Sequence, residues 1–259
     1  MREFFGFGGY QREPEGYLSW QHLLFVTTLM VIMVALAAFL GKKNRLQPLA
    51  VKNRVMIGTA ILIDALELFK IVLCCFRAED PMNWLYNLPL FLCSIQLIAI
   101  PLAAFTKGRL QEASLDFVCI FGVLGAVLGT YGAGQNYNAY PVLGFDNVVS
   151  GLTHSISGFA SLYILISGMA SMKKKNIGIT FAILFAFCIA AFVANHFADY
   201  NYMFLRAGDG TPYDILYNLV GGNPVLYPMS VVALFLVYIV IYYWVYFFIT
   251  GRKKAKAAV

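Results

Sequence analysis

Six polar or nucleophilic residues interrupt stretches of the chain that are otherwise almost entirely apolar: Asp64, Glu67, Lys70, Cys93, Gln96 and His154. The first three are spaced by three residues, which places their side chains on one face of a helix and allows Glu67 to pair with Lys70. Cys93 and Gln96 have the same spacing and therefore share a face as well. Ionisable groups are rare inside hydrocarbon, so each one is a candidate for function.

Cys93 and His154 are the two side chains best suited to covalent chemistry. A cysteine acts as a nucleophile when a base lies close by, and histidine is the most common general base. Counting 1.5 Å per helical residue from the outer end of each apolar stretch puts Cys93 about 12 Å deep and His154 about 10 Å deep. We therefore predict that Cys93 is a nucleophile, that His154 is its base, and that Glu67 orients the base or balances charge.

A further group of polar residues lies at similar depth or near the outer surface and is predicted to bind substrate: His22, Lys70, Gln96, His196, Asn201 and Tyr202. These residues and the catalytic candidates fall toward the outer side, whereas the inner half of the apolar stretches is nearly free of polar groups. The pattern predicts a polar cavity that opens toward the outside or the outer leaflet. The alternative for each residue is a purely structural role, since buried cysteines and histidines often serve packing alone.

The elements that position these residues are membrane helices. Of the 259 residues, 60% are hydrophobic and only 12% are charged, and the mean hydropathy is +0.72. A soluble domain has roughly 25% charged residues, so lipid must solvate much of this chain. The basic residues lie in short clusters between apolar runs, which is the pattern of a membrane protein and argues against a nucleic-acid partner.

Seven stretches are long and apolar enough to span a bilayer, which takes about 20 residues each. They are Ser19–Gly41, Val55–Phe76, Leu85–Phe105, Ser114–Gly134, Asn147–Met169, Ile177–Ala198 and Pro224–Thr250. Clusters of Lys and Arg follow the first, third, fifth and seventh stretches, and the alternate connections hold at most one such residue each. By the positive-inside rule we predict an all-α, seven-helix bundle in the cell membrane, with the N-terminus outside and the C-terminus inside.

This topology divides the chain into an extracytoplasmic segment at 1–18, a transmembrane domain at 19–250 and a basic cytoplasmic tail at 251–259. The seventh span contains no lysine, which excludes a retinal Schiff base of the usual rhodopsin kind. The chain also has no GxSxG, Walker A or HExxH motif, which excludes the familiar soluble hydrolases, ATPases and zinc proteases. The five cysteines form no CxxC pair, so no metal site and no cofactor is expected.

Five short motifs occur along the chain in this order: Leu-Ser-Trp-Gln-His22, Glu67, Asn-Leu-Pro-Leu-Phe-Leu-Cys-Ser94, Thr-His154-Ser and Asn-Tyr-Met-Phe-Leu205. Together they resemble the YwaF-like family of bacterial seven-span membrane proteins, to which an animal glycerophospholipid acyltransferase is distantly similar. That enzyme is described as using a cysteine just after the proline of the third span and a histidine on a later helix. The resemblance implies that His154 is this histidine. The cysteine position falls at Leu90, the histidine that usually follows it falls at Phe91, and Cys93 lies one turn further along.

Three functions remain open from the sequence. The first is a membrane-embedded enzyme that transfers or hydrolyses lipid acyl chains, with Cys93, His154 and Glu67 in the roles given above. The second is a non-catalytic transporter or binding protein for a small molecule or lipid, with the same cavity as its ligand site. The third is a structural role, in which the polar residues only hold the helices together. Membrane lipids are the expected partners.

Overall fold

The computed structural model describes residues 1–170 and 172–257, with side chains described as far as residue 251. The chain divides into two compact units, Met1–Ser171 and Met172–Val259. Every regular element among the described residues is a helix, which confirms the all-α prediction.

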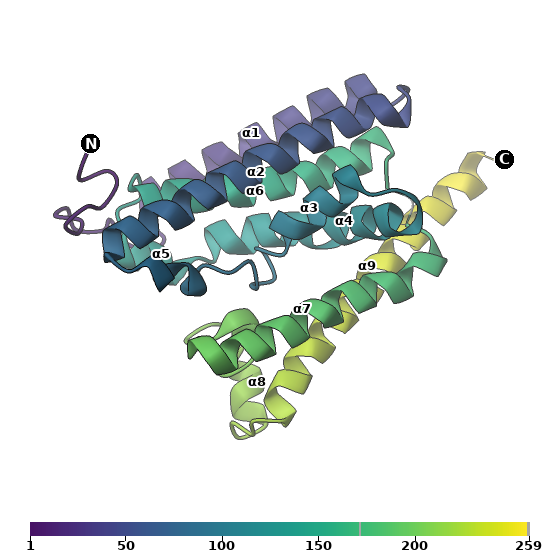
Figure 1. Ribbon diagram of the computed structural model, residues 1–259. Helices are drawn as coiled ribbons and strands as arrows, with labels where there is room; N and C mark the ends of the chain where they lie inside the picture. The colour runs from purple at the N-terminus through teal and green to yellow at the C-terminus, as the bar shows by residue number, and fades with distance from the viewer. Residues whose placement is uncertain (171, 258–259) are drawn as a thin grey trace. The chain divides into compact units, whose positions relative to one another are not determined.

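The first unit is a helical bundle with two short helices in its connections (Figure 1). Its elements are α1 (Trp20–Asn44), α2 (Leu49–Ala78), η1 (Pro81–Tyr86), α3 (Gln96–Phe105), α4 (Gly108–Tyr131), α5 (Gly134–Ala139) and α6 (Phe145–Ser167). Helix α6 contacts α1, α2 and α4 and so forms the centre of the bundle. It ends at Ser167 and is followed by Gly168, whose φ of 74° is the left-handed conformation in which glycine commonly terminates a helix.

Small residues let α4 and α6 approach closely. A Cβ atom added at Gly122 of α4 would lie 2.7 Å from the backbone oxygen of Ser157 and 2.7 Å from the Ser161 Cβ on α6. The Ser161 hydroxyl also donates a hydrogen bond to the Cys119 carbonyl of α4 at 2.8 Å. Glycine and serine at such contacts are typical of helix packing in membranes, where the backbones themselves come together.

The second unit consists of η2 (Lys174–Asn176), α7 (Ile177–Ala198), η3 (Tyr202–Phe204), α8 (Asp214–Leu219) and α9 (Leu226–Ala257). Helices α7 and α9 contact each other, and a hydrogen bond of 3.3 Å joins the Thr180 and Tyr243 hydroxyls. The bounds of α7 are those predicted for the sixth span. The uninterrupted apolar sequence between Ile177 and Ala198 explains that agreement.

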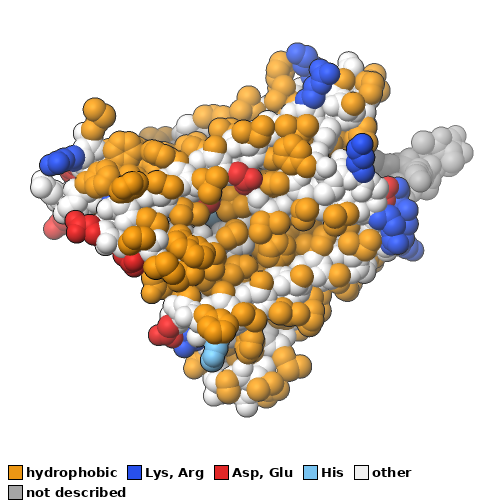
Figure 2. All heavy atoms as spheres, viewed as in Figure 1, with side chains coloured by type: hydrophobic (Ala, Val, Ile, Leu, Met, Phe, Trp, Pro, Cys, Tyr) orange, Lys and Arg blue, Asp and Glu red, His pale blue; other side chains and the backbone are white. Residues whose placement is uncertain are grey.

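Five helical segments within the described residues are long and apolar enough to cross a membrane: Trp20–Asn44, Gly108–Ala139, Phe145–Ser167, Lys174–Ala198 and Leu226–Gly251. Hydrophobic side chains cover most of the face seen in Figure 2, and most Lys and Arg side chains lie at its margins. These features support a multi-pass membrane protein. Helix α2 is continuous over 30 residues. Its apolar sequence, however, is interrupted by the charged residues Asp64, Glu67 and Lys70.

The third predicted span, Leu85–Phe105, is not one continuous helix. Its first residues belong to η1, the backbone at 87–95 is irregular, and only the last ten residues form α3. Pro89 lies in the irregular part and has no N–H to offer a helix. Cys93 therefore precedes the helix that Gln96 begins, and the two residues do not share a helical face as predicted.

Candidate functional site

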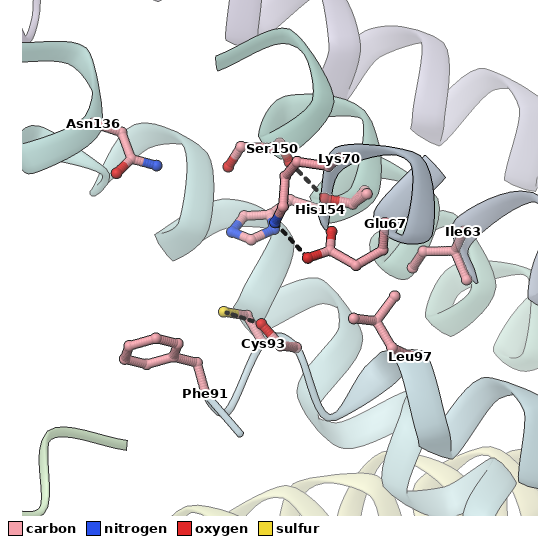
Figure 3. Close-up of a pocket in the computed structure, with 11 residues that line it drawn as sticks. Ile63, Glu67, Lys70, Phe91, Cys93, Leu97, Asn136, Ser150 and His154 are labelled. Carbon is pink, nitrogen blue, oxygen red and sulfur yellow. Dashed lines mark hydrogen bonds and ion pairs between the residues drawn. The ribbon is translucent and has the colours of Figure 1, made fainter. Parts of the chain in front are cut away.

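A cavity of about 190 Å³ lies within the first unit. Its apolar lining residues are Ile63, Phe91 and Leu97, and its polar ones are Glu67, Lys70, Cys93, Ser94, Asn136, Ser150, Thr153 and His154. Figure 3 shows most of these side chains around the cavity, and they come from α2, from α3 and the segment that leads into it, from α5 and from α6. A lining with an apolar part and several polar groups suits an amphipathic ligand.

The irregular segment at 87–95 brings Cys93 to the cavity. Within it, the Ile95 N–H donates to the Phe91 carbonyl at 3.0 Å and forms a turn around Cys93. Irregular backbone at membrane depth is tolerated where it is buried in protein or lines a cavity, and this segment supplies Phe91, Cys93 and Ser94 to the lining. The turn leads directly into α3, which begins three residues after Cys93.

Two glycines of α4 form the wall against which Cys93 and His154 pack. A Cβ atom at Gly125 would lie 3.4 Å from the Cys93 Cβ, and one at Gly129 would overlap the His154 imidazole. Side chains four residues apart on a helix are about 5–6 Å apart, so Cys93 and His154 rest on adjacent turns of the same helix face. Figure 3 shows the sulfur and the imidazole at the same cavity. The two predicted catalytic residues are therefore brought together.

Glu67 and Lys70 form the predicted ion pair on α2, beside the same cavity. Their side chains are only 11% and 21% exposed. The Lys70 ammonium is close enough to interact electrostatically with both the Cys93 thiol and the His154 ring. A cation in this position stabilises negative charge that forms on sulfur or on a substrate oxygen. Asp64, three residues before Glu67, is not part of the lining.

His22 and Gln96 lie outside the cavity lining. His22 is fully buried, and its Nδ1 accepts a hydrogen bond of 3.1 Å from the Leu18 N–H. Its Nε2 donates to the Thr130 carbonyl at 3.1 Å, and its ring lies 3.8 Å from that of Tyr137. These contacts fix one tautomer and give His22 a structural role, joining the start of α1 to the end of α4. Gln96 is also fully buried, in the first turn of α3.

The other predicted ligand contacts belong to the second unit. His196 is exposed in the last turn of α7. The Asn201 amide donates to the Ala207 carbonyl at 2.8 Å and holds the loop that follows η3. Tyr202 is fully buried, and its backbone N–H donates to the Asn195 side chain at 2.5 Å. The cavity itself is built from the first unit alone.

Four polar lining residues were not predicted from the sequence: Ser94, Asn136, Ser150 and Thr153. Ser150 precedes His154 by four residues, so helical spacing alone would have placed it on the histidine's face. Asn136 has no such signal, because the short helix α5 carries it to the cavity through tertiary packing. Leu90, the position of the family cysteine in the resemblance, is buried outside the lining, whereas Phe91 lines the cavity.

Comparison with known proteins identifies a family. The model of the TMEM164 family matches residues 17–251. That range includes every residue that lines the cavity and begins just before α1. No curated protein and no solved structure matches the chain significantly.

Proposed function

The chain belongs to the TMEM164 family, and we propose that it is a membrane-embedded lipid acyltransferase or lipid hydrolase with Cys93 as its nucleophile. The observation that carries the proposal is that Cys93 and His154 line one cavity and pack against adjacent turns of α4, at Gly125 and Gly129. His154 is the general base, Glu67 holds Lys70 in place, and Lys70 stabilises developing negative charge. The resemblance to the YwaF-like family supports His154 alone, because the family's cysteine position is Leu90 in this chain and Cys93 would be a substitute one turn further along.

The reaction has two halves, and in each half His154 first accepts one proton and then gives it up. The Cys93 sulfur attacks the carbonyl carbon of a lipid ester and forms a C–S bond, while the thiol proton passes to His154. The ester C–O bond breaks, and His154 gives this proton to the departing alkoxide, which leaves a thioester on Cys93. A hydroxyl of a second lipid, or water, then loses its proton to His154 as it attacks the thioester. The C–S bond breaks, and the proton returns to the sulfur.

The proposal includes the topology in which this site works. Seven spans, with α2 and the η1–α3 segment as the second and third, place all basic clusters on the cytoplasmic side of the cell membrane. The N-terminus is then outside, and membrane lipids are the substrates. Glu67 and Lys70 line the cavity, so their side chains are shielded from lipid. This shielding lowers the free-energy cost of placing charges in a span.

The test is to trap the acylated cysteine. The purified chain in lipid nanodiscs is incubated with a phospholipid that carries a labelled acyl chain and is then digested with trypsin. Cleavage after Arg77 and Lys107 isolates Cys93 as the only cysteine of its peptide. We expect this peptide to carry the acyl mass and to lose it in neutral hydroxylamine, which cleaves thioesters. Lipid turnover without any adduct on this peptide would refute Cys93 as the nucleophile.

Gly129→Ala is expected to lower lipid turnover by about 10²-fold, because a misplacement of about 1 Å has such an effect on a catalytic group. The new methyl group would occupy the position of the His154 ring and force it to move. Steady-state turnover in nanodiscs measures the effect. Gly58→Ala on α2 is the control, since no atom lies within 4 Å of its added methyl group. Unchanged turnover in Gly129→Ala would show that the position of His154 does not matter.

A second candidate function is a non-catalytic binding protein or transporter for a small polar or amphipathic ligand. The ion pair of Glu67 and Lys70 within the cavity favours it, because paired charges of this kind also mark ligand and proton pathways. The two functions differ in one measurement. A lipid that raises the thermal midpoint of the purified chain and is recovered chemically unchanged after hours would favour binding over catalysis.

A further inference from the structure

The N-terminal segment at 1–16 packs onto the ends of α2 and α6. Phe5 packs against an apolar cluster that contains Leu73 and Phe145, and the ring centroids of Phe5 and Phe145 are 5.4 Å apart. The Phe145 N–H donates a hydrogen bond of 2.9 Å to the Phe4 carbonyl. Figure 1 shows this segment, in purple, at the end of the first unit where α2 finishes and α6 begins.

An ion pair between Arg77 and Asp146, here called the clamp, holds the segment against both helices. The Arg77 guanidinium of α2 donates to both carboxylate oxygens of Asp146 on α6, at 2.6 and 2.7 Å, and to the Phe5 carbonyl at 3.2 Å. Two-pronged, charge-assisted bonds of this kind are among the strongest in proteins. The Tyr10 hydroxyl donates to the same carboxylate at 2.6 Å. Burial, together with Asp146, raises the pKa of Tyr10 to about 12, so this hydroxyl keeps its proton at physiological pH.

A glycine makes room for this clamp. Gly6 has a φ of +70°, and a Cβ atom there would lie 2.7 Å from the Arg77 Nη1. The backbone of the segment at Gly6 is therefore packed directly against the Arg77 guanidinium. Further along, the Val142 N–H donates to the Glu15 carboxylate at 2.8 Å and fastens the segment to the connection before α6.

The clamp lies just beyond the cavity on both of the helices that it joins. On α2, Arg77 follows the lining residue Lys70 by seven residues, or about 10 Å along the helix axis. On α6, Asp146 precedes the lining residue Ser150 by four residues, or about 6 Å. The segment thus bridges two walls of the cavity at the end away from the basic loop between α1 and α2.

We propose that residues 1–16 are a built-in cap that closes the cavity to water at this end, so that ligands reach Cys93 from the bilayer. The cap ends where the family match begins, at residue 17. The proposal goes beyond the acyl-transfer function, because a cap of this kind would equally direct lipid to a site that only binds it.

Thiol labelling of the chain in nanodiscs tests the cap, because a charged maleimide comes only from water whereas an uncharged, lipophilic maleimide also enters from the bilayer. Two variants open the clamp: Asp146→Asn, which removes its charge, and a chain that begins with Met followed by residue 17. Asp199→Asn is the matched control, since it weakens a carboxylate–arginine pair in the second unit. Tryptic peptides report Cys93 and the fully buried Cys119 separately.

We expect the charged maleimide to label Cys93 at least about tenfold faster in both cap variants than in the unaltered chain and the control, since the lost bonds are charge-assisted. The lipophilic maleimide should label all four proteins at similar rates. Equal rates with the charged reagent in the unaltered and shortened chains would overturn the proposal. If Cys119 also becomes labelled in a variant, that variant has unfolded. Tyr10→Phe, which removes only one hydroxyl, then replaces it, and its rate of Cys93 labelling by the charged maleimide is compared with that of the unaltered chain. Labelling needs no lipid turnover, so failure of the cap and failure of the enzyme proposal are distinguishable.

Discussion

Cys93→Ser and His154→Ala are each expected to lower lipid turnover by at least about 10³-fold, since loss of a nucleophile or its base removes most of the catalysis in comparable sites. The serine hydroxyl is a far weaker nucleophile than the thiol at neutral pH. Without His154, the described carboxylate of the lining is that of Glu67, which is already paired with Lys70. Turnover is measured with a labelled phospholipid in nanodiscs.

The same variants should leave the fold nearly unchanged. Cys93 and His154 are only partly buried and face a cavity rather than a packed core, so we expect the thermal midpoint to shift little. Cys75→Ser is the control thiol, since Cys75 is also half-buried but lies outside the cavity. Full turnover in both Cys93→Ser and His154→Ala would reject the catalytic proposal and leave ligand binding as the function of the cavity.

That Cys93 and His154 line one cavity could be predicted from the sequence, because both residues interrupt apolar stretches at similar depth. The ion pair of Glu67 and Lys70 followed in the same way from helical spacing, and the structure confirms it. His22 was also predicted to contact substrate, but it lies outside the cavity lining and both of its ring nitrogens bond to the backbone. Its hydrogen-bond partner, the Thr130 carbonyl, is 108 residues away, and no local pattern indicates which distant backbone atom a buried histidine will meet.

Hydropathy predicted helices well where the apolar run is continuous, as for α7, and poorly where the backbone is broken. The stretch at 85–105 is mostly apolar along its whole length and still contains an irregular segment around Pro89. A hydropathy average over 20 residues depends on composition and not on whether the helix is continuous. It could therefore not reveal the turn that carries Cys93. The four-residue spacing of Gly125 and Gly129 is typical of close packing between membrane helices. Their neighbours in the structure are the side chains of Cys93 and His154, which spacing alone does not indicate.

Lys70→Met is expected to reduce the free energy of unfolding by about 3–5 kcal/mol, because it leaves the Glu67 carboxylate without its partner in a site that is only 11% exposed. The double variant, Glu67→Gln with Lys70→Met, should recover most of this loss, since neither side chain then carries an unpaired charge. Reversible unfolding in mixed detergent micelles measures both.

The comparison separates a structural ion pair from a functional one. In the second unit, Asp199 and Arg206 form a pair with side chains 90% and 50% exposed, and Asp199→Asn should cost at most about 1 kcal/mol. If the double variant at positions 67 and 70 is stable and also keeps full lipid turnover, the pair serves the fold alone. We expect the double variant to be stable but slow, because without Lys70 no described cation in the lining remains to stabilise charge on the reacting oxygen. A stable and fully active double variant would remove Lys70 from the mechanism while leaving Cys93 and His154 in place.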